Sequence, residues 1–309
     1  MNTIKKFIIM LAYRSRRFKE EMHKAISLYK SPFLRTYPPG HYSSPIPNIK
    51  KILKEEDVIF NKRVKVCPGV FLNEEAQLEL LDKLAMYYDE LPFSDQPDGV
   101  RRYYYENRFF SYADAIVLYA IMRHFKPTKI IEVGSGFSSA VMLDTNDLFL
   151  GSSLHLTFIE PFTERLNRLI REKDENHCII VTRFVQEVQR ELFDTLNAHD
   201  ILFIDSSHVI KVGSDLACIV FEILPVLKPG VIIHFHDIFW PFQYPKEWFI
   251  EGRAWNEAYF IRAFLQFNNR FEVLYFNSFM GFHHSRILKN SMPLCLRNTG
   301  GSLWLRKIA

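Results

Sequence analysis

The chain has 309 residues, of which 48% are hydrophobic and 24% are charged, the proportions of an ordinary soluble globular protein. This length fits one large α/β domain with an appendage, or two modest domains, and the apolar content excludes disordered and fibrous classes. The net charge of +4 is concentrated in residues 1–24, which hold seven Lys and Arg against two Glu. The rest of the chain is close to neutral, so we expect no nucleic-acid partner.

The N-terminal apolar run Phe7–Tyr13 is too short to span a bilayer. It leads into RSRRFKEE and not into a small-residue cleavage site, so we expect no secretory signal. Two interpretations of residues 1–24 are open. We prefer a solvated helix that packs on the main domain; the other is a basic amphipathic helix in weak contact with a membrane surface or a partner.

Four cysteines are scattered along the chain, at Cys67, Cys178, Cys218 and Cys295. None belongs to a C-x-x-C pair, and none has a histidine nearby at metal-ligand spacing. This pattern predicts a reduced, cytoplasmic chain without a disulfide framework or a structural zinc site.

The hydrophobic pattern changes after about residue 100. Before it, helical patches such as Glu74–Tyr88 are interrupted by Pro-rich loops at 37–47 and 91–99. From Ser111 onward, short apolar runs alternate with longer periodic segments. The predicted strands are Lys129–Val133, Leu154–Ile159, Cys178–Val181, Ile201–Ile204, Val231–Phe235, Phe271–Phe276 and Ser302–Lys307. The predicted helices are Ser138–Asp144, Thr163–Lys173, Gln186–Asn197, Asp215–Leu224 and Asn256–Phe267.

Strands separated by single helices predict right-handed crossovers and a doubly wound α/β domain with a mostly parallel sheet. The last two strands are expected to form a terminal hairpin at one edge. Ligands of such sheets lie at the carboxyl ends of the strands, near the switch point.

The first predicted strand ends in a glycine-rich loop, in which Gly134 and Gly136 allow a tight turn and Ser138 and Ser139 can cap the following helix. A dinucleotide site wants G-x-G-x-x-G, but Ser139 stands at the third glycine position. Glu132 precedes the loop, and a carboxylate there would repel a pyrophosphate. It suits S-adenosylmethionine, whose sulfonium and amino groups are cationic.

The second strand ends at Glu160, where a ribose diol would be hydrogen-bonded in either cofactor class; a surface carboxylate at a helix start is the alternative. Gln186 opens a helix after the third strand, where the adenine edge would lie. The predicted cofactor-binding set is Glu132, Gly134, Ser135, Gly136, Ser138, Ser139, Glu160, Gln186 and Asp205.

The segment from Tyr103 to about Leu274 resembles the class I S-adenosylmethionine-dependent methyltransferase superfamily. It is most similar to the branch of small-molecule and sugar O-methyltransferases and cephalosporin-hydroxylase-like proteins. IIEVGSGFSS, FIEP, DILFIDSSH and LKPGVIIHFHDIF carry the resemblance, in the family's order. It implies a seven-stranded Rossmann-like sheet in residues 101–309, whose last hairpin contributes the antiparallel strand, and a helical cap in residues 1–100.

The fourth and fifth strands deliver candidate catalytic residues to the same edge. Methyl transfer needs a deprotonated, aligned nucleophile, and histidine is the natural base near neutral pH, so His208 and His236 are the candidates. Asp205, which closes an apolar strand, joins them because burial of an unused acid is costly. His234 lies deeper on the strand, where we expect a buried structural histidine.

A divalent metal is the other way to ionise a hydroxyl. The resemblance implies that some relatives hold Mg²⁺ through an acid after the fourth strand and two adjacent acids after the fifth. Asp205 and Asp237 match that pattern, whereas His236 replaces one acid, which suits a transition metal better than Mg²⁺.

Aromatic segments are candidates for the acceptor pocket. Residues 103–110 (YYYENRFF) with Asn107, the pair His41 and Tyr42, and the loop 240–260 could line it, or the aromatics could simply pack a cap on the sheet. The predicted function is O-methylation of a sugar or another small hydroxylated metabolite. The alternatives are an S-adenosylmethionine-binding protein with hydroxylase-like chemistry and, disfavoured by the loop, an NAD-dependent oxidoreductase. The acceptor and the oligomeric state stay open.

Overall fold

The computed structural model describes residues 16–309, which form two compact units, one ending at Ile59 and the other spanning Phe60–Ala309. The interpretations of residues 1–24 fall mostly on residues outside this description. Within the described part, no helix combines the length and the apolarity needed to cross a membrane. All four cysteines are free.

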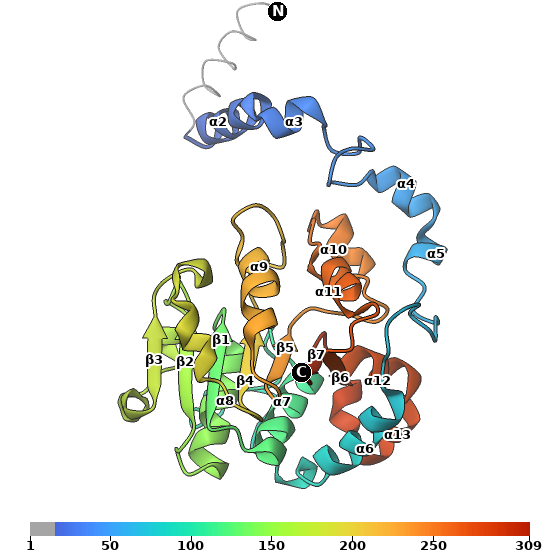
Figure 1. Cartoon of the computed structure of the whole chain (residues 1–309). Helices are drawn as coiled ribbons and strands as arrows, with labels where there is room; N and C mark the ends of the chain where they lie inside the picture. Colours follow the sequence, from blue (N-terminus) through green and yellow to red (C-terminus); the bar gives the residue numbers. More distant parts are fainter. Residues whose placement is uncertain (1–15) are drawn as a thin grey trace, which may run out of the picture. The chain divides into compact units, whose positions relative to one another are not determined.

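The N-terminal unit consists of short helices and loops. Its described helices are α2 (Arg16–Lys30), α3 (Pro32–Thr36), α4 (Ile49–Lys54) and α5 (Glu56–Ile59) (Figure 1). Asn48 caps α4 by accepting a hydrogen bond from the Lys51 amide. Pro32 stands at the start of α3, where its missing N–H costs nothing.

The second unit is built on a seven-stranded sheet in the order β3-β2-β1-β4-β5-β7-β6 (Figure 1). The strands are β1 (Lys129–Val133), β2 (His155–Ile159), β3 (Cys178–Val181), β4 (Ile201–Ile204), β5 (Ile232–Phe235), β6 (Phe271–Phe276) and β7 (Leu303–Lys307). The first five are parallel, and β7 is antiparallel to both β5 and β6. The predicted doubly wound fold is confirmed, with the strand order reversing between β1 and β4.

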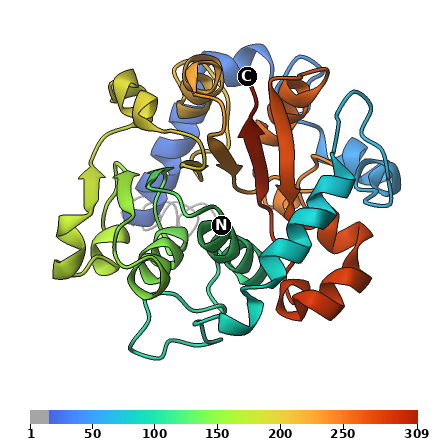
Figure 2. The ribbon, with the colours of Figure 1, turned by 60° about the horizontal axis from the view of Figure 1, so that its bottom comes forward.

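Helices cover the sheet. The α-helices are α6 (Glu74–Ala85), α7 (Tyr112–Phe125), α8 (Phe137–Phe149), α9 (Asp215–Cys218), α10 (Lys246–Ile250), α11 (Glu257–Leu265), α12 (Asn277–His283) and α13 (Ser285–Ser291). A π-turn at Ile219–Ile223 extends α9. The 3₁₀ turns are Tyr88–Glu90, Leu166–Arg168, Glu172–Asn176, Val185–Glu187, Arg190–Thr195, Leu224–Val226 and Pro293–Leu296. Figure 2 shows α6, α7 and α8 side by side, and α6 also packs on β6.

Three sequence expectations differ from the structure. The helices predicted at 163–173 and 186–197 are pairs of 3₁₀ turns. The last two strands pair as expected, but α12 and α13 connect them and β7 is inserted between β5 and β6, so they do not form a simple edge hairpin. Residues 60–100 belong to the same compact unit as the sheet. A functional cap spanning residues 1–100 stays a prediction.

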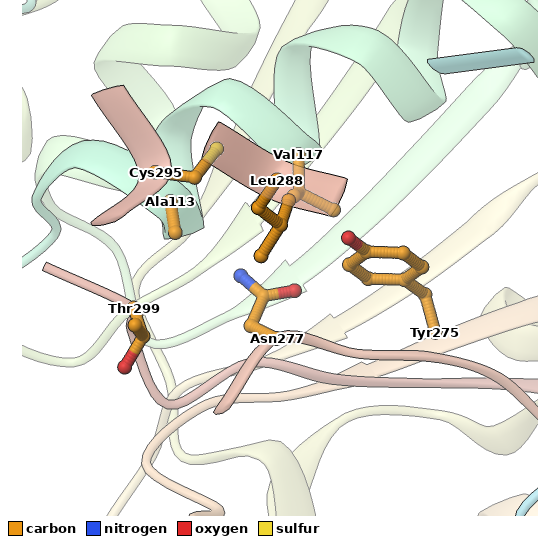
Figure 3. Close-up of a pocket in the computed structure, with 7 residues that line it drawn as sticks. All are labelled: Ala113, Val117, Tyr275, Asn277, Leu288, Cys295 and Thr299. Carbon is orange, nitrogen blue, oxygen red and sulfur yellow. The ribbon is translucent and has the colours of Figure 1, made fainter. Parts of the chain in front are cut away.

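The core lies on both faces of the central strands, and every residue of β4 and β5 is buried. A small cavity of about 180 Å³ remains where α7 meets α13 and the C-terminal turns. Figure 3 shows that mostly apolar side chains, including Val117 and Leu288, surround Asn277 there. This cavity is a packing gap, and the residues predicted to be functional lie elsewhere.

Candidate active site

Polar residues follow the carboxyl ends of β2, β1, β4 and β5 and lie side by side along one edge of the sheet. Backbone hydrogen bonds continue past the strands: the Gly134 amide donates to Ile159, the Asp205 amide to Val133 and the His236 amide to Ile204. A cleft of about 990 Å³, open solvent at its mouth included, lies over this edge. Its walls contain nine predicted site residues: Gly134, Ser135, Gly136, Ser138, Glu160, Asp205, His208, His236 and Asp237.

The glycine loop is shaped by its contact with the next strand. Gly134 has a φ of +82°, and a Cβ at this position would lie 1.7 Å from the carbonyl oxygen of Asp205. Only glycine fits there without displacing the end of β4. The hydroxyl oxygens of Ser135 and Ser206, which line the cleft beside this contact, are buried and have no hydrogen-bond partner in the described structure. Buried hydroxyls of this kind point to a bound ligand.

Glu132 supports the loop from behind and does not line the cleft. It is fully buried, and its carboxyl group accepts hydrogen bonds from the hydroxyls of Ser138 (2.5 Å) and Ser139. Burial raises the pKa of Glu132 to about 8, although both serines oppose that rise. The attraction of its charge for a cationic cofactor is therefore weaker than the sequence suggested. Direct contact of Glu132 or Ser139 with a cofactor stays a prediction.

Glu160 lines the cleft beside the glycine loop. Its carboxylate accepts hydrogen bonds from the Ser135 amide (3.0 Å) and the Phe162 amide (2.8 Å). Each oxygen keeps a free lone pair, so the group can still accept from a diol. Gln186 does not join this set: it is exposed, and its amide lies 3.4 Å from the Gly213 carbonyl.

His208 is held by three carboxylates. Its Nδ1 lies 2.8 Å from Oε2 of Glu257, and its Nε2 lies 3.4 Å from Oδ1 of Asp205 and 3.6 Å from Oδ2 of Asp237. Burial lowers the pKa of His208, but the hydrogen bonds to Asp205 and Glu257 outweigh burial and raise this pKa well above its usual range. His208 and Asp237 both have a φ of +57°, an uncommon conformation for residues other than glycine and one that clusters at functional sites.

Glu257 is the residue of this cluster that sequence reasoning missed. It opens α11 and is 2% exposed, and burial raises its pKa although His208 opposes that rise. Its neighbour Asn256 anchors the helix by pairing with both backbone groups of Ile210, at 2.8 and 3.1 Å. Its place at the start of a predicted helix was the available signal, but no spacing rule connects it with His208.

The two histidines of β5 differ. His236 faces the cleft, and its Nε2 lies 3.5 Å from Oδ1 of Asp237. Burial lowers its pKa, but the acids around it, Asp237 first, raise it to about 9. His234 is fully buried, stacks on Phe203 and lies 2.9 Å from the Ser302 hydroxyl. Burial lowers the pKa of His234 well below its usual value, as expected for a neutral structural histidine.

Aromatic and cationic side chains form the outer wall of the cleft. Trp248, Arg253 and Trp255 come from the loop after β5, and the Arg253 guanidinium lies over the Trp248 ring at 4.3 Å. Arg108, Phe109 and Phe110 come from the segment before α7. Asn107 holds the shape of this segment. Its side-chain amide donates hydrogen bonds to the carbonyls of Tyr104 and Phe110 and accepts them from the backbone amides of Phe109 and Phe110. His41 and Tyr42 belong to the N-terminal unit.

The predicted metal ligands do not form a compact donor set. In the described chain, the one group of three close His, Cys, Asp or Glu donors is Asp147, Asp174 and His177, away from the cleft. Arg102 already binds Asp147 and Asp174 at 2.7 and 2.8 Å, which satisfies those charges. The described structure does not bring Asp205, His236 and Asp237 together as such a donor group, so a metal at these residues stays a prediction.

We compared the chain with known protein families. Residues 131–238, from the middle of β1 through the loop after β5, match the family described as Methyltransferase domain. The match covers the glycine loop, Glu160, Asp205, His208, His236 and Asp237. Residues 131–238 of the chain are therefore a methyltransferase domain.

Other similarities accompany this match. An uncharacterized protein of Archaeoglobus fulgidus is 34% identical to this methyltransferase over 166 residues, which are 52% of this chain and 74% of that protein. The apo structure of CmcI is similar at 16% identity, with 64% and 71% of the two chains covered and a TM-score of 0.40. The O-methyltransferase TomG from Streptomyces achromogenes, in complex with S-adenosylmethionine, is similar at 13% identity, with 85% and 97% covered and a TM-score of 0.41.

Proposed function

We propose that this methyltransferase acts on a hydroxyl group of a small acceptor, a sugar or another hydroxylated metabolite, and that His208 accepts the hydroxyl proton. The observation that carries the proposal is the placement of His208 inside the cleft. Glu257 holds its Nδ1, while its Nε2 lies among Asp205 and Asp237 at the edge that also carries the glycine loop.

The residues of the cleft fit the cofactor. The unpartnered hydroxyls of Ser135 and Ser206 and the close approach at Gly134 leave backbone and side-chain groups directed at a ligand. Glu160 would hold the ribose diol, and residues 134–138 would hold the amino-acid end. S-adenosylmethionine supplies a methyl group on a cationic sulfonium that a nucleophile can attack.

His208 would position the acceptor hydroxyl and remove its proton. A histidine whose Nδ1 is hydrogen-bonded to a carboxylate keeps a fixed orientation and presents Nε2 to the substrate. The hydrogen bonds to Asp205 and Glu257 raise the pKa of His208 and so favour the protonated ring. A bound cation beside it lowers that pKa, because like charges disfavour each other. Binding of the cationic cofactor would therefore favour the unprotonated form of His208, which is the form that accepts a proton.

The walls of the cleft support a small ring-shaped acceptor. Trp248, Trp255 and Phe109 offer flat apolar faces, and Arg108 and Arg253 offer hydrogen-bond donors, although Arg253 also pairs with Glu251 at 3.0 Å. Sugars combine apolar C–H faces with hydroxyl groups, so this combination of walls suits them.

The test is methyl transfer from radiolabelled S-adenosylmethionine to a panel of monosaccharides, nucleotide sugars and small phenols, with wild type and His208→Gln. We expect transfer to at least one hydroxylated acceptor. His208→Gln should lower the rate about a hundredfold or more at unchanged cofactor affinity, because a general base contributes factors of this size. Full activity of His208→Gln on the same acceptor would overturn the assignment. Each assay is repeated after EDTA treatment: retained activity is expected, and loss restored only by a divalent metal would contradict this route.

A further inference from the structure

The two units of the chain differ in charge. Residues 1–59 contain twelve Lys and Arg against five Asp and Glu, a formal net charge of +7. Residues 60–309 contain 27 against 30, a formal net charge of −3. The basic character of the whole protein therefore comes entirely from its N-terminal unit.

The side chains that the structure describes in the N-terminal unit form no hydrophobic core. None of the side chains described between residues 19 and 59 is buried. Large apolar side chains are instead exposed, with Phe33 at 84%, Tyr42 at 94% and Val58 at 80%. Exposed apolar groups in such number beside many cations are typical of a surface that meets a partner.

Helix α2 has the amphipathic pattern of an interfacial helix. Met22, Ala25 and Ile26 have a spacing that puts them on one helix face. Lys19 and Lys30 both lie along one side of that face, and both are exposed. The helix is polar on average despite this stripe, which distinguishes a helix lying in an interface from one that spans a bilayer.

Helix α4 also has exposed lysines beside apolar side chains, over fewer residues than α2. Its sequence is IKKILK, and Lys50, Lys51 and Lys54 are exposed beside the partly exposed Ile49 and Leu53. Cations beside apolar groups fit a bilayer that carries negative headgroups, because the headgroups attract the lysines while the apolar side chains enter the headgroup boundary. Nucleic acid would account for the cations and leave the aliphatic side chains exposed.

We propose that the N-terminal unit binds the surface of a membrane that contains anionic phospholipid and so holds the methyltransferase at that surface. The proposal is independent of the acceptor and of the catalytic role of His208. It rests on the charge of residues 1–59, on the absence of burial among their described side chains and on the amphipathic helices α2 and α4.

The experiment is co-sedimentation of the full chain with large unilamellar vesicles of phosphatidylcholine alone or mixed with phosphatidylglycerol in equal parts. We expect binding to the mixed vesicles only, and its loss at about 0.5 M NaCl, where exposed charges are screened. Lys50→Glu/Lys51→Glu should weaken binding at least tenfold, and Phe33→Ser should weaken it several-fold. Arg286→Glu/Lys289→Glu, an equal charge reversal on the exposed part of α13, should bind as wild type does.

Binding of S-adenosylhomocysteine to each variant checks that the second unit is folded. Equal sedimentation with neutral vesicles, or none with anionic vesicles at low salt, would overturn the proposal. So would polyuridylic acid that displaces the protein from vesicles at equal charge concentration, because the partner would then be a nucleic acid.

Discussion

The imidazole of His208 contacts three carboxylates that come from three different parts of the chain. Asp205 directly follows β4 and Asp237 stands two residues after β5, so the strand pattern predicted that both would lie at the sheet edge that also carries His208. Glu257 lies 49 residues further along the chain than His208, beyond a loop whose path no periodicity describes. The positions of the two acids near strand ends could therefore be predicted, whereas the position of Glu257, at the start of α11 and beyond that loop, could not.

The pH dependence of methyl transfer should report on Glu257. A base acts in its unprotonated form, so activity rises as pH rises through the pKa of His208. Glu257 is one of the groups that raise this pKa. Glu257→Gln should therefore shift the rising limb of the kcat/KM profile to lower pH, while kcat at the plateau falls because the ring is less well oriented. Glu222→Gln, on a surface acid that pairs with Arg190, should leave the profile in place. A limb that stays in place or moves to higher pH in Glu257→Gln contradicts this role.

Among the elements, strands were predicted more closely than helices. Each of the seven strands begins and ends within one residue of its predicted position, because short apolar runs bounded by turn signals have few other solutions. In the segment predicted as a helix at 163–173, Arg102 donates a hydrogen bond to the Leu169 carbonyl, which competes with the bond that a continuing helix would make there. Likewise, Arg190 binds the carbonyls of Val185 and Val188. Such side-chain competition is invisible to a periodicity argument.

Arg102 should stabilise the segment before α7. Its guanidinium is almost fully buried and pairs with Asp144, Asp147 and Asp174 at 2.7 to 2.8 Å, which joins this segment to α8 and to the turn before β3. Arg102→Ala leaves buried acids without a partner and should lower the free energy of unfolding by about 3–5 kcal/mol. Lys24→Ala, at an exposed pair with Glu21, should cost less than about 1 kcal/mol. Urea denaturation measures both, and equal losses would contradict the assignment.

At the scale of the whole molecule, the chain combines a basic N-terminal unit, whose described side chains are not buried, and a larger unit that contains the entire cleft. Composition located the positive charge at the N-terminal end, and the motifs located the cofactor edge. The strand order reverses between β1 and β4, and the glycine loop, Asp205 and His208 all lie at that point. The outer wall of the cleft could not be derived from the sequence because its residues come from two separate segments, one before α7 and one after β5.

Isothermal titration calorimetry of S-adenosylhomocysteine tests the central claim most directly, with wild type, Glu160→Ala and Glu164→Ala as the matched exposed acid. We predict one site per chain with micromolar affinity in wild type and Glu164→Ala. Binding to Glu160→Ala should be weaker by about tenfold or more, because a carboxylate that accepts from a ribose diol contributes on the order of 1.5–3 kcal/mol. Absence of binding to wild type, or unaltered affinity in Glu160→Ala, would contradict the cofactor site described here.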